Sequence, residues 1–109
     1  MLTHADVREI ALALPEAHEA PHFESASFRV GKKIFCTMGE NGPGIVLKFT
    51  PEDQHNLSQG HPEYITPVAG YWGRSGWTQV AFATIERGPL ADLVRMAWAG
   101  VAPKRLLKG

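Results

Sequence analysis

Two histidines, His18 and His22, are the first residues in the chain that suggest metal chemistry, with Glu19 and Glu24 close by. Imidazole and carboxylate groups are common zinc ligands. The stretch lies between two prolines and is predicted to be extended, so both imidazoles point to one side but stand about 13 Å apart at ~3.3 Å per residue. One ion cannot bridge that distance. The sequence therefore predicts no metal site here, and it predicts no cofactor.

Nucleophilic and acid–base chemistry have equally few candidates. A cysteine nucleophile needs an activating base and a lowered pKa, whereas Cys36 falls within a predicted strand, where a free thiol usually packs as a small hydrophobe. Glu52 and Asp53 resemble a catalytic carboxylate pair, but they follow Thr50 and Pro51, and acidic residues favour the first turn of a helix. Because no pair of base and nucleophile emerges, we predict that the protein is not an enzyme.

A group of basic and aromatic residues is the best candidate for a binding surface. The basic residues lie on predicted strands, their turns or a long loop, and the aromatic residues lie in that loop or just after it. This combination can hold phosphates and stack bases, or bind an anionic or aromatic small molecule or a protein. A structural interpretation stays open, in which the Trp rings cap the sheet core and the charges keep its edges soluble. The candidate site residues are Lys32, Lys33, Lys48, Trp72, Arg74 and Trp77.

Both ends of the chain are predicted to be helical. Thr3 can cap a helix that runs to about Leu14, Asp6 complements its dipole, and Pro15 ends it. The last helix opens at residues 88–89 and carries the most regular apolar stripe in the chain. The stripe consists of Leu90, Leu93, Val94, Ala97, Trp98 and Val101.

The region after the first helix is predicted to form strands. Residues 25–30 and 33–38 flank a two-residue turn. That loop length sets Phe28 opposite Phe35, and aromatic pairs across strands help to fix the register. With a third strand over residues 45–49, the sequence predicts a meander of at least three antiparallel strands.

The second half of the chain completes one domain. A helix is predicted over residues 51–60, a brief strand over 65–68, a loop over 69–76 and a strand over 77–83. The sequence therefore predicts a single α+β domain over residues 1–109. Its antiparallel sheet packs against an N-terminal and a C-terminal helix.

Composition limits the function classes further. Eleven Lys and Arg balance eleven Asp and Glu, whereas a dedicated nucleic-acid binder usually carries excess positive charge. A single cysteine excludes an intramolecular disulfide framework and suits a reducing compartment. The N-terminus is unlike a signal peptide, and no apolar stretch approaches the ~20 residues that span a bilayer. We expect a soluble, cytoplasmic protein with no membrane partner.

Short motifs spread over nearly the whole chain carry a family resemblance. They are ALPE at 13–16, FRVGKKIF at 28–35, VLK at 46–48, GYWGRSGW at 70–77 and VAPKR at 101–105. In order and spacing the chain resembles the MmcQ/YjbR family. The resemblance implies an α+β fold related to the CyaY/frataxin-like arrangement, and a DNA-binding role. It does not imply frataxin's iron activity, which needs an acidic ridge, because the first helix offers only Asp6 and Glu9 before its last turn.

Two hypotheses for function remain. In the first, the protein is a non-enzymatic binding domain that binds DNA weakly and without sequence preference through the basic and aromatic residues, as the resemblance implies. In the alternative, the same surface is a small-molecule or protein-interaction module with no nucleic-acid role. The balanced net charge favours the alternative, and the family resemblance favours DNA.

Overall fold

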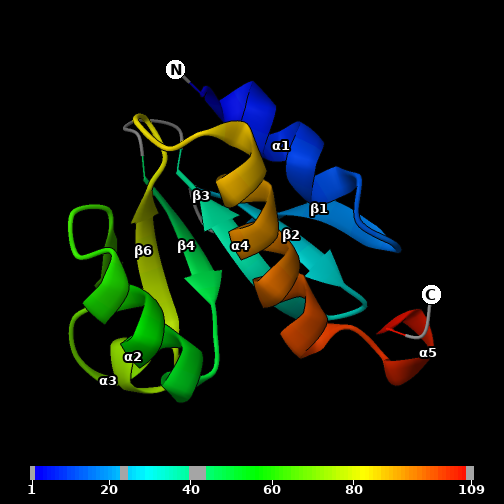
Figure 1. The fold of residues 1–109 in the computed structure, drawn as a ribbon. Helices are drawn as coiled ribbons and strands as arrows, with labels where there is room; N and C mark the ends of the chain where they lie inside the picture. Colours follow the sequence, from blue (N-terminus) through cyan, green and yellow to red (C-terminus); the bar gives the residue numbers. More distant parts are fainter. Residues whose placement is uncertain (1, 23–24, 40–43, 108–109) are drawn as a thin grey trace.

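The computed structural model describes residues 2–22, 25–39 and 44–107. These residues form a six-stranded antiparallel sheet in the order β1-β2-β3-β4-β6-β5, together with five helices (Figure 1). The predicted α+β fold, an antiparallel sheet packed against a helix near each end, is confirmed. The helices are α1 (His4–Leu12), α2 (Pro51–Gly60), α3 (Tyr71–Arg74), α4 (Arg87–Val101) and α5 (Lys104–Leu107). The strands are β1 (Ala17–His22), β2 (Ser25–Val30), β3 (Lys33–Met38), β4 (Gly44–Lys48), β5 (Ile65–Pro67) and β6 (Trp77–Ala81).

The first two helices begin at the predicted caps. The Thr3 hydroxyl accepts a hydrogen bond from the Asp6 N–H at 3.3 Å, and the Asp6 carboxylate accepts one from the Thr3 N–H at 2.8 Å. This reciprocal capping box lowers the pKa of Asp6, chiefly through the bond from the Thr3 backbone. In α2, Thr50 Oγ1 accepts a bond from the Asp53 N–H at 3.0 Å, and Pro51 occupies the first turn. Asp53 is therefore a helix-start residue.

The first helix ends at Leu12, two residues before the predicted Leu14. Its last turn tightens, because the Leu14 N–H bonds to the Ala11 carbonyl only three residues back, at 3.3 Å. Ala17 then bonds back to Leu14 and begins β1. The turn before Pro15 therefore closes as a short 3₁₀-type bend.

The β2–β3 hairpin contains a bulge that the sequence did not predict. The two-residue turn pairs Val30 with Lys33, but Phe28 lies opposite Cys36, so the predicted pairing of Phe28 with Phe35 is wrong. Phe35 is the additional residue on β3. The bulge turns both Phe35 and Cys36 into the core, where each is fully buried, whereas strict alternation would expose one of them.

The sheet is wider than the predicted meander. β1 adds an edge strand beside β2, and β6 returns to pair with β4 before β5 closes the other edge. Each edge strand contains a proline, Pro21 in β1 and Pro67 in β5. The predicted loop at 69–76 contains the single helical turn α3.

Helices α1 and α4 lie on one face of the sheet, and α2 and α3 lie together near one end of it (Figure 1). The covered face of the sheet and these two helices form the main core. In the part of the chain that the structure describes, no helix is long and apolar enough to cross a membrane.

Trp98 anchors α4 to this core. Its side chain is 1% exposed, and its indole Nε1 donates a hydrogen bond to the Pro15 carbonyl at 3.0 Å. The predicted apolar stripe is confirmed, since five of its residues are buried and Val101 is half-buried. The buried members are Leu90, Leu93, Val94, Ala97 and Trp98.

We predict that Trp98→Ala lowers the free energy of unfolding by about 3–5 kcal/mol, because it removes a large buried ring and leaves a cavity. Urea denaturation followed by circular dichroism measures the change. Met96→Ala is the matched control on the same helix, since Met96 is 39% exposed and its loss should change stability little. Equal urea midpoints for the two variants would contradict the assignment of Trp98 to the core.

Candidate binding site on the open face of the sheet

The face of the sheet opposite α1 and α4 carries the candidate site. Directly paired residues of antiparallel strands share a face, and Thr37, Val46 and Gln79 form one such row across β3, β4 and β6. We call this surface the open face. Its described side chains include His18, His22, Ser25, Ser27, Arg29, Ile34, Thr37, Val46, Lys48, Trp77 and Gln79.

A groove of about 390 Å³ crosses the open face. Its apolar lining comes from β3, β4, α3, β6 and the segment after β5, and His22, Ser25, Thr37 and Gln79 add polar groups. The volume falls within the range of small-ligand sites in proteins. We call it the aromatic groove, and its apolar lining residues are Ile34, Val46, Val68, Trp72 and Trp77.

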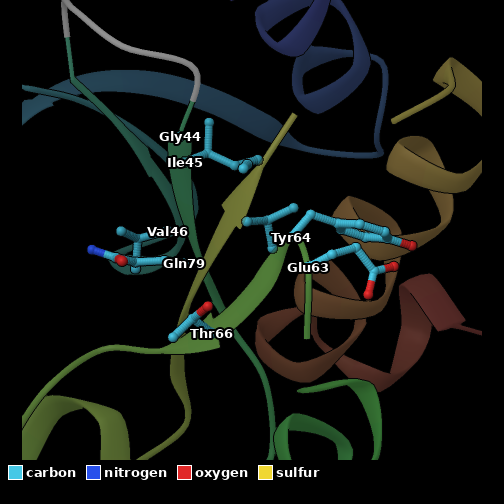
Figure 2. Close-up of a pocket in the computed structure, with 9 residues that line it drawn as sticks. Gly44, Ile45, Val46, Glu63, Tyr64, Thr66 and Gln79 are labelled. Atoms are coloured by element: carbon cyan, nitrogen blue, oxygen red, sulfur yellow. The ribbon is translucent and has the colours of Figure 1, made fainter. Parts of the chain in front are cut away.

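A second hollow of about 360 Å³ adjoins the groove at the β4–β6–β5 side and shares Val46 and Gln79 with it. Figure 2 shows Val46 and Gln79 pointing to one side of the strands, and Glu63 and Tyr64 to the other. This hollow therefore wraps around the sheet edge. Because it carries the exposed Glu63 carboxylate, it is a poorer place for an anion than the aromatic groove.

Two exposed aromatic side chains stand beside the groove on α3. Tyr71 is 65% and Trp72 63% exposed, the highest values among the described large hydrophobic residues. Their rings meet edge to face, with centroids 5.6 Å apart. Trp77 is half-buried at the start of β6. The structural interpretation, in which the Trp rings cap the core, therefore fits Trp77 better than Trp72.

The α3 loop, residues 70–76, is held by polar contacts from two other elements. The buried Gln54 of α2 uses Nε2 to donate to Gly73 O at 2.8 Å, Trp77 O at 3.0 Å and Thr78 Oγ1 at 3.1 Å. From β4, Lys48 Nζ donates to the Ser75 carbonyl. These contacts fix the backbone that follows Trp72.

Two glycines let the α3 loop approach the sheet closely. A Cβ on Gly73 would lie 1.7 Å from Val68 O, and one on Gly76 would lie 1.9 Å from Phe49 O. Gly76 also has a φ of +109°, which only glycine adopts readily. These two glycines therefore allow the backbone of the α3 loop to pack directly against the backbone of Val68 and Phe49.

The structure gathers the six predicted site residues at one end of the sheet. Lys48 pairs with Trp77, and the turn that carries Lys32 and Lys33 lies at the same end because the strands are antiparallel. Trp72 and Trp77 line one groove, and Arg74 is exposed on α3. Lys48 differs from the other three cations, because it is half-buried and its ammonium is bound to the Ser75 carbonyl. Of the cations, Lys32, Lys33 and Arg74 stay exposed.

Sequence reasoning missed several residues that build the groove. Ile34, Val46 and Gln79 line it, yet they lie in strands where only charged and aromatic residues stand out as candidate ligand contacts. Val46 could have been found, since it stands between the buried Ile45 and Leu47 and must therefore face away from the core. Gln54 gave no signal, because a glutamine within a polar helix usually faces water.

Charge is divided unequally between the two sides of the molecule. On the helix side, four carboxylates pair with three arginines. Among the described strand residues, none on the open face is acidic. Among these strand residues, basic groups are therefore in excess on the open face, although the net charge of the chain is zero. The ion pairs of the helix side are Arg8–Glu19, Arg87–Asp6, Arg87–Glu9 and Arg105–Glu16.

Comparison with known proteins identifies the family and supports the fold. The YjbR family model matches residues 12–99. The chain belongs to the YjbR family. The chain is similar to the crystal structure of Deinococcus radiodurans protein DR2400, with family-model domain DUF419, at a TM-score of 0.81 and 26% identity. That match covers 95% of this chain and 81% of the other chain. No curated protein matches.

Of the remaining reactive groups of this YjbR-family chain, Cys36 is inert and His22 lines the groove. Cys36 is fully buried in the core, and burial raises the pKa of its thiol far above the usual range. His18 and His22 lie on the same side of β1, as predicted. Within residues 2–22, 25–39 and 44–107, no group of three or more His, Cys, Asp or Glu is placed to hold a metal ion.

We predict that iodoacetamide alkylates Cys36 at least about tenfold more slowly in the folded protein than in urea, because modification requires both opening of the core and a thiolate. Intact-mass spectrometry over time at pH 8 measures both rates. Equal rates would show that the thiol is accessible and would reopen a nucleophilic role.

We also predict that Gly73→Ala lowers the free energy of unfolding by about 1–3 kcal/mol, as expected for overpacking. Gly100→Ala is the matched control, because nothing lies within 4 Å of its added methyl group and alanine favours a helix. Urea titration of the two variants should shift the midpoint in opposite directions. A Gly73→Ala protein as stable as wild type would contradict the close approach to Val68.

Proposed function

We propose that this YjbR-family protein is a non-enzymatic binding domain that binds DNA weakly and without sequence preference on its open face. The observation that carries the proposal is an aromatic groove with no acidic residue among its lining, with exposed cations at the same end of the sheet. Phosphates attract Lys and Arg, and aromatic rings stack on bases. The resemblance of the sequence motifs to the MmcQ/YjbR family implies the same ligand.

The division of charge supports an anionic ligand despite the net charge of zero. On the helix side, arginines neutralise carboxylates within the protein, as in the Arg105–Glu16 pair. That pair lowers the pKa of Glu16 through the hydrogen bonds from Arg105. Lys32, Lys33 and Arg74 have no such carboxylate partner within the described residues. Their charges are therefore available to phosphates.

Weak and sequence-independent binding is expected from the elements present. Reading of bases in duplex DNA requires a helix or a two-stranded ribbon that enters the major groove. The longest described helix, α4, presents its apolar side to the sheet, and α3 is a single turn. Three exposed cations supply few phosphate contacts.

The groove volume favours one alternative. About 390 Å³ is enough for a small aromatic anion, and the lining is mostly apolar with a few polar groups. In this alternative, the protein is a small-molecule or protein-interaction module with no nucleic-acid role. The two proposals differ in whether a polyanionic backbone contributes to affinity.

Fluorescence anisotropy with labelled duplex and single-stranded DNA tests the proposal. Three phosphate contacts predict a slope of log affinity against log salt of roughly −3 for the duplex. Lys32→Glu/Lys33→Glu should reduce the slope to about −1 and leave the unfolding midpoint nearly unchanged, because both lysines are exposed at a turn.

Lys32→Glu and Arg95→Glu form a matched pair, since each replaces one exposed cation and changes the net charge equally. Arg95 lies on α4, where its guanidinium stands over the Trp98 ring on the covered side of the sheet, so its replacement should weaken binding less. Absence of binding to either DNA form at low salt would remove the DNA proposal and leave the alternative. Equal losses in the two variants would contradict the assignment to the open face.

A further inference from the structure

Trp72 is exposed in a way that the fold does not require. Its indole is 63% exposed, although Trp98 shows that this chain can bury such a ring almost completely. Exposing a large aromatic surface to water is unfavourable. An exposed Trp beside a groove is therefore best explained by a partner that covers it.

Hydrogen bonds and close packing hold the backbone that presents Trp72. Ser75 Oγ donates to the Trp72 carbonyl at 3.0 Å, and Gln54 binds the next carbonyl, that of Gly73, at 2.8 Å. Gly73 itself lies against Val68, where no side chain fits. A backbone that is already ordered loses little conformational entropy on binding. The α3 loop therefore holds the backbone of Trp72 in one position before a ligand binds.

From these observations, we infer that the open face binds single-stranded nucleic acid in preference to duplex, with one base stacked on Trp72 beside the aromatic groove. The inference rests on the proposed function and specifies its ligand. In a duplex the bases stack on one another and present only their edges in the grooves. Only an unpaired base can offer its face to an indole.

The surroundings of Trp72 suit a single strand. The groove beside it is floored by apolar side chains such as Ile34 and Val46, which can accept a base but not a phosphate. The uncharged polar groups of Ser25, Thr37 and Gln79 can form hydrogen bonds to the edge of a base, with little preference among the four bases. A duplex laid on this face would place its phosphates over the apolar floor.

Two exposed cations lie close in the sequence to residues of the groove. Arg74 follows Trp72 by two residues on α3, and Lys32 lies in the β2–β3 turn two residues before Ile34. Both lie at the same end of the sheet as the two groove tryptophans. A flexible single strand can turn its bases inward and its phosphates outward toward these groups.

The test compares three fluorescently labelled probes of equal length: oligothymidylate, a duplex, and an abasic strand that keeps the phosphates but lacks the bases. At low salt the wild type should bind oligothymidylate several-fold more tightly than either other probe. Trp72→Ala should weaken oligothymidylate binding about 5- to 150-fold, the loss typical of one stacked base. Affinity for the duplex and the abasic strand should change less than twofold.

Two further variants serve as controls. Trp72→Phe keeps an aromatic face and should restore most of the affinity for oligothymidylate. Met96→Ala removes an exposed apolar side chain from α4 and should change no affinity. Urea midpoints establish that each variant is folded, which is expected for Trp72→Ala because its ring is mostly exposed.

The outcomes separate the two proposals. If duplex and oligothymidylate bind equally and Trp72→Ala affects neither, the single-strand inference is overturned while DNA binding stands. If the abasic strand binds as tightly as oligothymidylate, base stacking is overturned. If no probe binds at low salt, the proposed function is overturned together with the inference.

Discussion

The packing of α4 across one face of the sheet determines how the other elements of this molecule can be arranged. The helix has a single apolar stripe, and Trp98 fixes its position by filling the core and bonding to Pro15 O at 3.0 Å. α1 packs beside α4 on the same face (Figure 1). The second face of the sheet is left without α1 or α4, and its side chains face solvent and the groove.

The two faces of the sheet differ in their charged groups as well as in whether helices pack on them. Where the helices pack, carboxylates and guanidinium groups neutralise one another at short range, as between Arg87 and Glu9 at 2.8 Å. On the open face, basic groups stand beside uncharged polar and aromatic residues. Net charge is therefore a poor guide to the ligands of this protein, because it averages over two surfaces of different character.

Local signals in the sequence predicted the elements well, whereas contacts between distant segments could not be predicted. Thr3 and Thr50 are followed three residues later by acids, and this short-range pattern determines where the helices begin. The bulge at Phe35 depends on two adjacent residues both fitting the core, which strand alternation alone cannot indicate. The contact of Gln54 with Gly73 spans nineteen residues and has no local signature. For the candidate site, the sequence can indicate aromatic and basic residues, because they are recognisable by type. The residues that form the floor of a groove are defined only by the fold.

The prolines at the two sheet edges have a consequence for how partners approach. Pro21 and Pro67 lack the amide hydrogen that a neighbouring strand would need at those positions. Neither edge is therefore a good template for adding a strand from another chain, which protects a six-stranded sheet with one uncovered face from edge-to-edge aggregation. Recognition by backbone pairing, the route that many peptide-binding sheets use, is disfavoured here. Partners are left to approach perpendicular to the sheet, onto side chains rather than onto main-chain groups.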